Sequence, residues 1–156
     1  MSITIQTSFE KLEYYCRNQR FKGWDPYDGL NSRLFLSLPG FLKGRIVKLF
    51  WIQFFKRSPV NFRTIAGVVK DYNSKGLGLF LSSYCNLYLK QPKQEYLEKI
   101  NFFADHLLTT QRTDYSGSCW GYNFDWQARA FFQPKNTPTV VATVFIASAL
   151  LDAYEI

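Results

Sequence analysis

The stretch SKGLGLFLSSYCNLYLKQPKQEYLEKINFFADHLLTTQ, residues 74–111, holds two apolar stripes at helical spacing, one on each side of a short break. The first stripe comprises Leu77, Phe80, Leu81, Tyr84 and Tyr88, and the second comprises Tyr96, Leu97, Ile100, Phe103, Ala104, Leu107 and Leu108. Because the break at Gln91 and Pro92 allows only a short turn, we predict two antiparallel neighbouring helices, residues 74–89 and 94–111. No strand precedes Gly76 and Gly78, so these glycines are interpreted as permitting close helix contact rather than nucleotide binding.

Three further helices are predicted outward from this hairpin. One runs from a Ser8 cap to about residue 19, and one covers residues 41–57. A third begins at Pro138, capped by Thr137, and continues nearly to residue 156. The segment FKGWDPYDGLNS, residues 21–32, is predicted to be irregular. The sequence therefore predicts an all-α chain.

The helices at 41–57 and after 138 raise questions of packing. In the former, the predicted core face is Ile46, Val47, Phe50, Trp51 and Phe54, opposite Arg45, Lys48, Gln53 and Lys56. This basic amphipathic pattern also suits a membrane surface, but an ordinary core helix is favoured. The last helix is apolar nearly all round and requires neighbours on several sides. Helical hairpins that cover one another in an open solenoid or a closed toroid would supply them.

Composition limits the classes of function. The 156 residues are 47% hydrophobic and 19% aromatic, which predicts one packed domain. The net charge of +7 divides into 13 basic and 5 acidic residues in 1–75, and 6 basic and 7 acidic residues in 76–156. Such a basic half favours an anionic partner or serves only solubility. Three isolated cysteines and the absence of a signal peptide or an 18-residue apolar run predict a cytoplasmic protein. No metal or cofactor motif is found, so neither is expected.

Four strings resemble one protein family: GWDPYDGLNS, WIQFFKRSPVNFR, YNSKGLGLFLSSY and CWGYNFDWQARAFFQPKNTPTVVATVFIASALLDAYE. Together they are similar to the N-terminal part of a largely uncharacterised bacterial and archaeal family of α/α-toroid proteins. Members of that family resemble six-hairpin glycosidases, tend to be encoded among polysaccharide-biosynthesis genes, and sometimes carry a delta-aminolevulinic acid dehydratase label. The resemblance implies that residues 1–156 form a single partial α/α-toroid domain, truncated relative to the family, with a carbohydrate-related function.

The segment from Thr113 to Asn136 is unusually long for a connection between helices and is rich in aromatic residues. We expect it to fold over the mouth of the ring, where aromatic planes can pack on sugar rings and polar groups can bond hydroxyls. An alternative is that the aromatic side chains form a structural plug. The candidate substrate-binding residues are Trp120, Tyr122, Asn123, Trp126, Gln127, Arg129 and Asn31.

Carboxylates supply the candidate catalytic groups, Asp125 and Asp28. A glycosidase needs an acid and a base or nucleophile, about 5 to 9.5 Å apart. Asp25 and Asp28 also stand in Asp-Pro and Asp-Gly pairs, in which an aspartate often bonds nearby backbone amides. We favour this turn interpretation for Asp25. For Asp28, the turn and the catalytic interpretations are equally supported.

Three functions follow as hypotheses. The first is a hydrolase-like or lyase-like toroid that acts on a bacterial polysaccharide. The second is a non-catalytic glycan-binding or assembly protein that uses the aromatic loop and the basic half. The third is a membrane-surface or protein-interaction module led by residues 41–57. We expect a glycan or polysaccharide intermediate as partner, no nucleic acid, and self-association as one way to cover the last helix.

Overall fold

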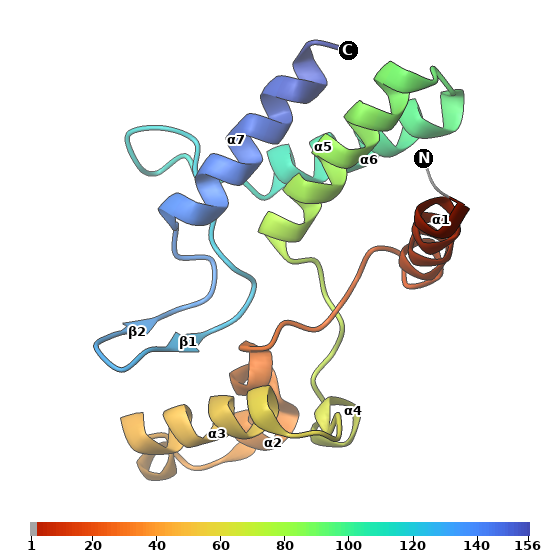
Figure 1. Ribbon diagram of the computed structural model, residues 1–156. Helices are drawn as coiled ribbons and strands as arrows, with labels where there is room; N and C mark the ends of the chain where they lie inside the picture. The colour runs from red at the N-terminus through yellow and green to blue at the C-terminus, as the bar shows by residue number, and fades with distance from the viewer. Residues whose placement is uncertain (1–2) are drawn as a thin grey trace.

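A computed structural model describes residues 3–156 and is mostly helical (Figure 1). The helices are α1 (Ile3–Asn18), η1 (Asp28–Asn31), α2 (Arg33–Ser37), η2 (Gly40–Leu42), α3 (Arg45–Arg57), α4 (Arg63–Ala66), α5 (Ser74–Lys90), α6 (Gln94–Thr109) and α7 (Val140–Tyr154). Two antiparallel strands, β1 (Trp126–Gln127) and β2 (Phe132–Gln133), form a small hairpin between α6 and α7. The all-α prediction is confirmed, with this hairpin as an addition.

The first group of elements, the hairpin lobe, consists of α1, α5, α6 and α7. The α5–α6 hairpin is present as predicted, and α7 packs along α5 (Figure 1). At their contact, a Cβ on Gly78 would lie 3.2 Å from Cγ1 of Ile146, so glycine permits the close approach. The core of this lobe contains Leu77, Leu81, Tyr84, Cys85, Ile100, Phe103, Leu107, Trp120, Ala142, Ile146 and Ala149.

The second group, the basic lobe, is η1, α2, η2, α3 and α4, drawn in orange and yellow in Figure 1. It has two smaller cores, one of Leu30, Phe35 and Ile52, the other of Phe55, Ala66 and Val68. Residues 19–27 and 67–73 connect the lobes, and residues 110–139, which join α6 to α7, carry the β1–β2 hairpin to α3 of the basic lobe (Figure 1). The first two connections are paired, since Gly23 and Asp71 exchange two backbone hydrogen bonds of 3.1 and 3.0 Å. These connections frame the space where the candidate site lies.

Two predicted helix caps are wrong. Ser8 lies inside α1, where its hydroxyl donates to the carbonyl of Thr4 at 2.8 Å instead of capping the N-terminus. The cap of α7 is Thr139, whose side chain accepts from the amide of Ala142 at 3.1 Å, and not Thr137. Both segments offer several hydroxyl residues in succession, and local sequence does not tell which of them takes the cap geometry.

The predicted core face of α3 is only partly correct, since Val47 and Trp51 do pack against a core but other members of that face do not. Ile52 and Phe55 are buried, whereas the side chains of Ile46 and Phe50 are 82% and 67% exposed. This helix packs on η1 and β1 through one side only, and its sequence offers apolar residues on nearly every side. Periodicity therefore could not choose the face that the rest of the chain covers.

The last helix, α7, buries Ala142, Ile146 and Ala149 and leaves its outer side apolar and exposed. On that side Val140 and Leu151 are 80% and 60% exposed. Within residues 3–156, no helix combines the length and the apolar character that crossing a bilayer requires.

Candidate functional site

Two aspartates are held in one turn at the start of the basic lobe. A carboxylate oxygen of Asp25 accepts from the amide of Tyr27 at 2.9 Å, and a carboxylate oxygen of Asp28 accepts from the amide of Asp25 at 2.9 Å. The other oxygen of Asp25 accepts from Nδ2 of Asn73 at 3.0 Å, across from the start of α5. The local turn predicted from the sequence is present, and the bond to Asn73 also fixes the Asp25 carboxylate to the N-terminus of α5.

Arg63 completes this cluster from α4. Its Nε donates to Oδ1 of Asp28 at 2.8 Å, and one terminal nitrogen donates to the carbonyl of Asp25 at 3.0 Å. The side chains of Arg63 and Asp28 are 10% and 8% exposed, so this is a buried ion pair. It fixes α4 to the Asp25–Asp28 turn.

Burial governs the protonation of both carboxylates. Burial raises the pKa of Asp25, the amide of Tyr27 opposes that rise, and the negative charge of Asp28 adds to it. Burial also raises the pKa of Asp28, against the lowering effect of Arg63. Two neighbouring carboxyl groups with raised pKa values are suited to exchange protons or to bond hydroxyl groups.

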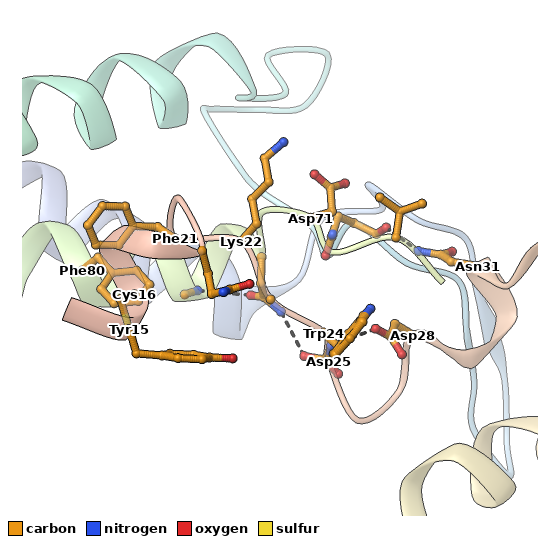
Figure 2. Close-up of a pocket in the computed structure, with 16 residues that line it drawn as sticks. Tyr15, Cys16, Phe21, Lys22, Trp24, Asp25, Asp28, Asn31, Asp71 and Phe80 are labelled. Atoms are coloured by element: carbon orange, nitrogen blue, oxygen red, sulfur yellow. Dashed lines mark hydrogen bonds between the residues drawn. The ribbon is translucent and has the colours of Figure 1, made fainter. Parts of the chain in front are cut away.

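Both aspartates line an amphipathic pocket of about 230 Å³ between the lobes. Figure 2 shows Tyr15, Cys16, Phe21 and Phe80 at one end of this pocket, and Asp25, Asp28 and Asn31 toward the other. The rings of Phe21 and Phe80 meet edge to face, with centroids 5.1 Å apart. The amphipathic pocket thus offers an apolar wall opposite a carboxylate wall, as in pockets that orient a small polar ligand.

A second, larger pocket of about 540 Å³ adjoins the first and is called the aromatic pocket here. Its aromatic lining comes from Tyr27, Tyr122, Phe124 and Trp126. Tyr122 stacks on Phe124 with centroids 5.3 Å apart, and Trp126 meets Tyr27 edge to face at 5.9 Å. The two pockets share Asp25, Asn73 and Gly76 in their walls, and Lys75 adds a cation to the aromatic one.

Asn123 connects the aromatic loop to the Asp28 segment. Its backbone carbonyl accepts from Nδ2 of Asn31 at 3.0 Å, and its side chain lines the amphipathic pocket. Within residues 3–156, the buried side-chain oxygen of Asn123 has no hydrogen-bond partner. A buried polar atom of this kind usually has a partner, so this oxygen is an exception among the described residues. Asn31 and Asn123, two of the candidate substrate-binding residues drawn from the sequence, are therefore in direct contact.

The other predicted site residues lie elsewhere. Trp120 is 3% exposed in the core of the hairpin lobe, where its Nε1 donates to the carbonyl of Leu107 at 2.8 Å. Gln127 is buried and closes the β1–β2 hairpin by donating to Ala128 and Phe131.

Asp125 and Arg129 also lie apart from the two aspartates. Asp125 accepts from the amide of Lys135 at 2.8 Å and lines neither the amphipathic nor the aromatic pocket, whereas Asp28 lines the former. Arg129 is exposed between β1 and β2. The loop is thus divided: Tyr122, Phe124 and Trp126 line a pocket, and Trp120 is a core residue.

Several residues of the site are absent from the set of candidates drawn from the sequence, among them Asp25, Tyr27, Arg63 and Asn73. Asn73 could have been found, because an asparagine before SKGLG is a typical N-cap, and its Oδ1 does accept from the amide of Gly76 at 3.1 Å. Arg63 gave no such signal, since its partner lies 35 residues earlier in the chain. Tyr27 lies within the irregular segment but was not singled out.

No protein-family model, curated protein or solved structure matches this chain. Within residues 3–156, no group of three His, Cys, Asp or Glu side chains is placed to hold a metal ion. The function is therefore argued from the two pockets alone.

Proposed function

We propose that this protein binds an acidic glycan across the amphipathic and aromatic pockets. The observation that carries the proposal is the shared wall, in which Asp25 and Asn73 border both pockets. A sugar in the aromatic pocket would find hydrogen-bonding groups at one side and aromatic faces at the other. A neighbouring sugar unit would reach the carboxylates of the amphipathic pocket.

Sugar chemistry fits these linings. A sugar ring has an apolar face that packs on an aromatic plane, here Tyr122 or Trp126, both half-buried and lining the aromatic pocket. Its hydroxyl groups can donate to the carboxylate of Asp25, which borders both pockets. Lys75 at the rim of the aromatic pocket supplies a cation for a sugar carboxylate, which supports an acidic glycan.

A second candidate is hydrolase-like chemistry, favoured by the raised pKa values of Asp25 and Asp28. In that chemistry Asp25 would serve as the acid and Asp28, which is paired with Arg63, as the base. The sequence-based pair of Asp28 and Asp125 has less support, because Asp125 borders neither pocket. Turnover that Asp25→Asn abolishes even at glycan concentrations that saturate the variant would separate this candidate from plain binding.

The α/α-toroid arrangement and a cytoplasmic location belong to this proposal as well. The antiparallel α5–α6 hairpin, with α7 packed beside it, supports a hairpin array. The exposed apolar side of α7 supports self-association as the means of covering it. Light scattering on fractions from size exclusion tests this part, and a monomer whose mass is independent of concentration would contradict it.

The binding proposal is tested by calorimetric titration with an oligouronide and with a neutral gluco-oligosaccharide of the same length. Wild-type protein should bind the oligouronide, and Trp126→Ala and Asp25→Asn should each weaken it by about tenfold or more. Tyr115→Ala is the matched control, because Tyr115 is an exposed aromatic residue of the same loop that lines neither pocket. Equal affinity in Trp126→Ala and Tyr115→Ala, or no binding of either sugar, would refute the proposal.

A further inference from the structure

The outward side of the basic lobe carries large apolar side chains in solvent. Phe41 in η2 is 84% exposed, Ile46 at the start of α3 is 82% exposed, and Phe50 one turn later is 67% exposed. At about 100° per residue, Phe50 lies about 40° and Arg57 about 20° from Ile46 around the helix. Ile46 and Phe50 therefore form one exposed apolar stripe along α3, with Arg57 on the same side, and Phe41 is exposed in η2 just before this helix.

Basic side chains border this stripe. Arg45, Lys56 and Arg57 are all exposed. Residues 29–70 contain no aspartate or glutamate and eight basic residues: Arg33, Lys43, Arg45, Lys48, Lys56, Arg57, Arg63 and Lys70. Apart from Arg63, which is paired with Asp28, these cations have no salt bridge among the described residues. The charged groups on and beside the stripe are thus all positive.

The opposite side of α3 faces the rest of the protein. Ile52 and Phe55 are buried there, and Nζ of Lys48 lies 3.7 Å from the ring centroid of Phe132 in β2. The β1–β2 hairpin, whose Trp126 lines the aromatic pocket, therefore lies on the side of α3 away from the stripe. A partner on the stripe would leave the proposed glycan pockets open.

We propose that this face of α3 and η2 docks on an anionic lipid bilayer. Phe41, Ile46 and Phe50 would enter the boundary between headgroups and acyl chains, while Arg45 and Arg57 would lie at the level of the lipid phosphates. Charge complementarity selects this partner. A second copy seated through the same face would bring Arg45 and Arg57 of both chains together, and this repulsion disfavours a symmetric dimer. The exposed side of α7, by contrast, has no such border of cations.

The test is co-sedimentation of the purified chain with vesicles of phosphatidylcholine alone and with vesicles containing 30% phosphatidylserine. Wild-type protein should bind only the anionic vesicles, and binding should weaken as salt rises. Ile46→Ser with Phe50→Ser, and separately Arg45→Gln with Arg57→Gln, should each weaken binding by about tenfold or more. The control is Val144→Ser with Leu151→Ser. These two apolar residues of α7 are also exposed, and replacing them should leave vesicle binding unchanged.

The substituted positions Arg45, Ile46, Phe50 and Arg57 are all exposed, so these variants should keep the circular dichroism and the denaturation midpoint of the wild type. Absence of binding to anionic vesicles at low salt would overturn the proposal. So would equal binding by wild type and the Ile46→Ser, Phe50→Ser variant. A dimer that this variant dissolves would also overturn it, because the face would then serve self-association. Glycan titration of the same variant is expected to match wild type, so failure here is separable from failure of the glycan proposal.

Discussion

Asp28 and Arg63 form a buried ion pair with an Nε to Oδ1 distance of 2.8 Å. The pair joins η1 to α4 across the basic lobe, and Arg63 also donates to the backbone carbonyl of Asp25. Asp28 therefore has a structural role, whatever ligand the adjoining pocket takes. A loss of activity in an Asp28 variant is informative only beside a measurement of its stability.

Replacing Asp28 by alanine should leave Arg63 buried without its partner and lower the free energy of unfolding by about 3 to 5 kcal/mol. Urea denaturation followed by circular dichroism measures the change. The control is Asp114→Ala, which removes an exposed Arg112–Asp114 pair and should change stability little. Similar losses in the two variants would contradict a special role for the buried pair.

Gly121 should not tolerate a side chain. A Cβ at this position would overlap the backbone carbonyl of Thr137, where the loop runs back against itself before α7. We expect Gly121→Ala to lower the free energy of unfolding by about 3 kcal/mol or more, since backbone must move to make room. Gly117→Ala, in the same loop but with open space around it, should be close to neutral in the same urea titration. A neutral Gly121→Ala would show that the loop closes differently.

Trp120 and Trp126 should separate stability from binding. Trp120→Phe removes the donor to the carbonyl of Leu107, one of the last carbonyls of α6, and leaves space in the core. It should cost about 2 kcal/mol in unfolding free energy while leaving glycan affinity of the folded protein unchanged. Trp126→Phe should cost less stability, because this side chain is half-buried. A Trp120→Phe variant of full stability and lost affinity would make Trp120 a binding residue.

Asp25 gives the chain a specific pH dependence. Because burial raises its pKa above the ordinary value of 3.8, the folded state holds the proton more tightly than the unfolded state. Its stabilising contribution is therefore full below pH 3.8 and is lost as pH rises through the raised pKa. The unfolding free energy of wild type minus that of Asp25→Asn should increase as pH falls from 7 toward that ordinary value. A difference that is flat or decreases over this range would show that the carboxylate is not destabilised by burial.

The helices were predictable where two independent sequence signals agreed. In residues 74–111 the apolar spacing and the Gln91-Pro92 break agree, and α5 and α6 appear within a few residues of the predicted bounds. In α3 the same periodic reasoning selected Ile46 and Phe50 for the core, and the structure exposes them. The difference is that α3 is apolar on several sides, and only tertiary contacts with η1 and β1 decide which side is covered.

The site was predictable only in part for a similar reason. The aromatic loop was recognised, and Tyr122 and Trp126 do line a pocket, but nothing local distinguishes them from Trp120, which α6 covers. Asp25 was assigned to a turn, which is correct, yet the same carboxylate also bonds Asn73, 48 residues later. Contacts over such separations depend on how the two lobes meet, and no short motif records them.

The most direct test of the central claim is a two-dimensional amide NMR titration of the full chain with the oligouronide. We expect saturable shifts for the pocket-lining residues Asp25, Asn73, Gly76, Tyr122 and Trp126, with the outer faces of α3 and α7 unmoved. Shifts confined to those outer faces, or no shifts at millimolar sugar, would contradict a glycan site between the lobes.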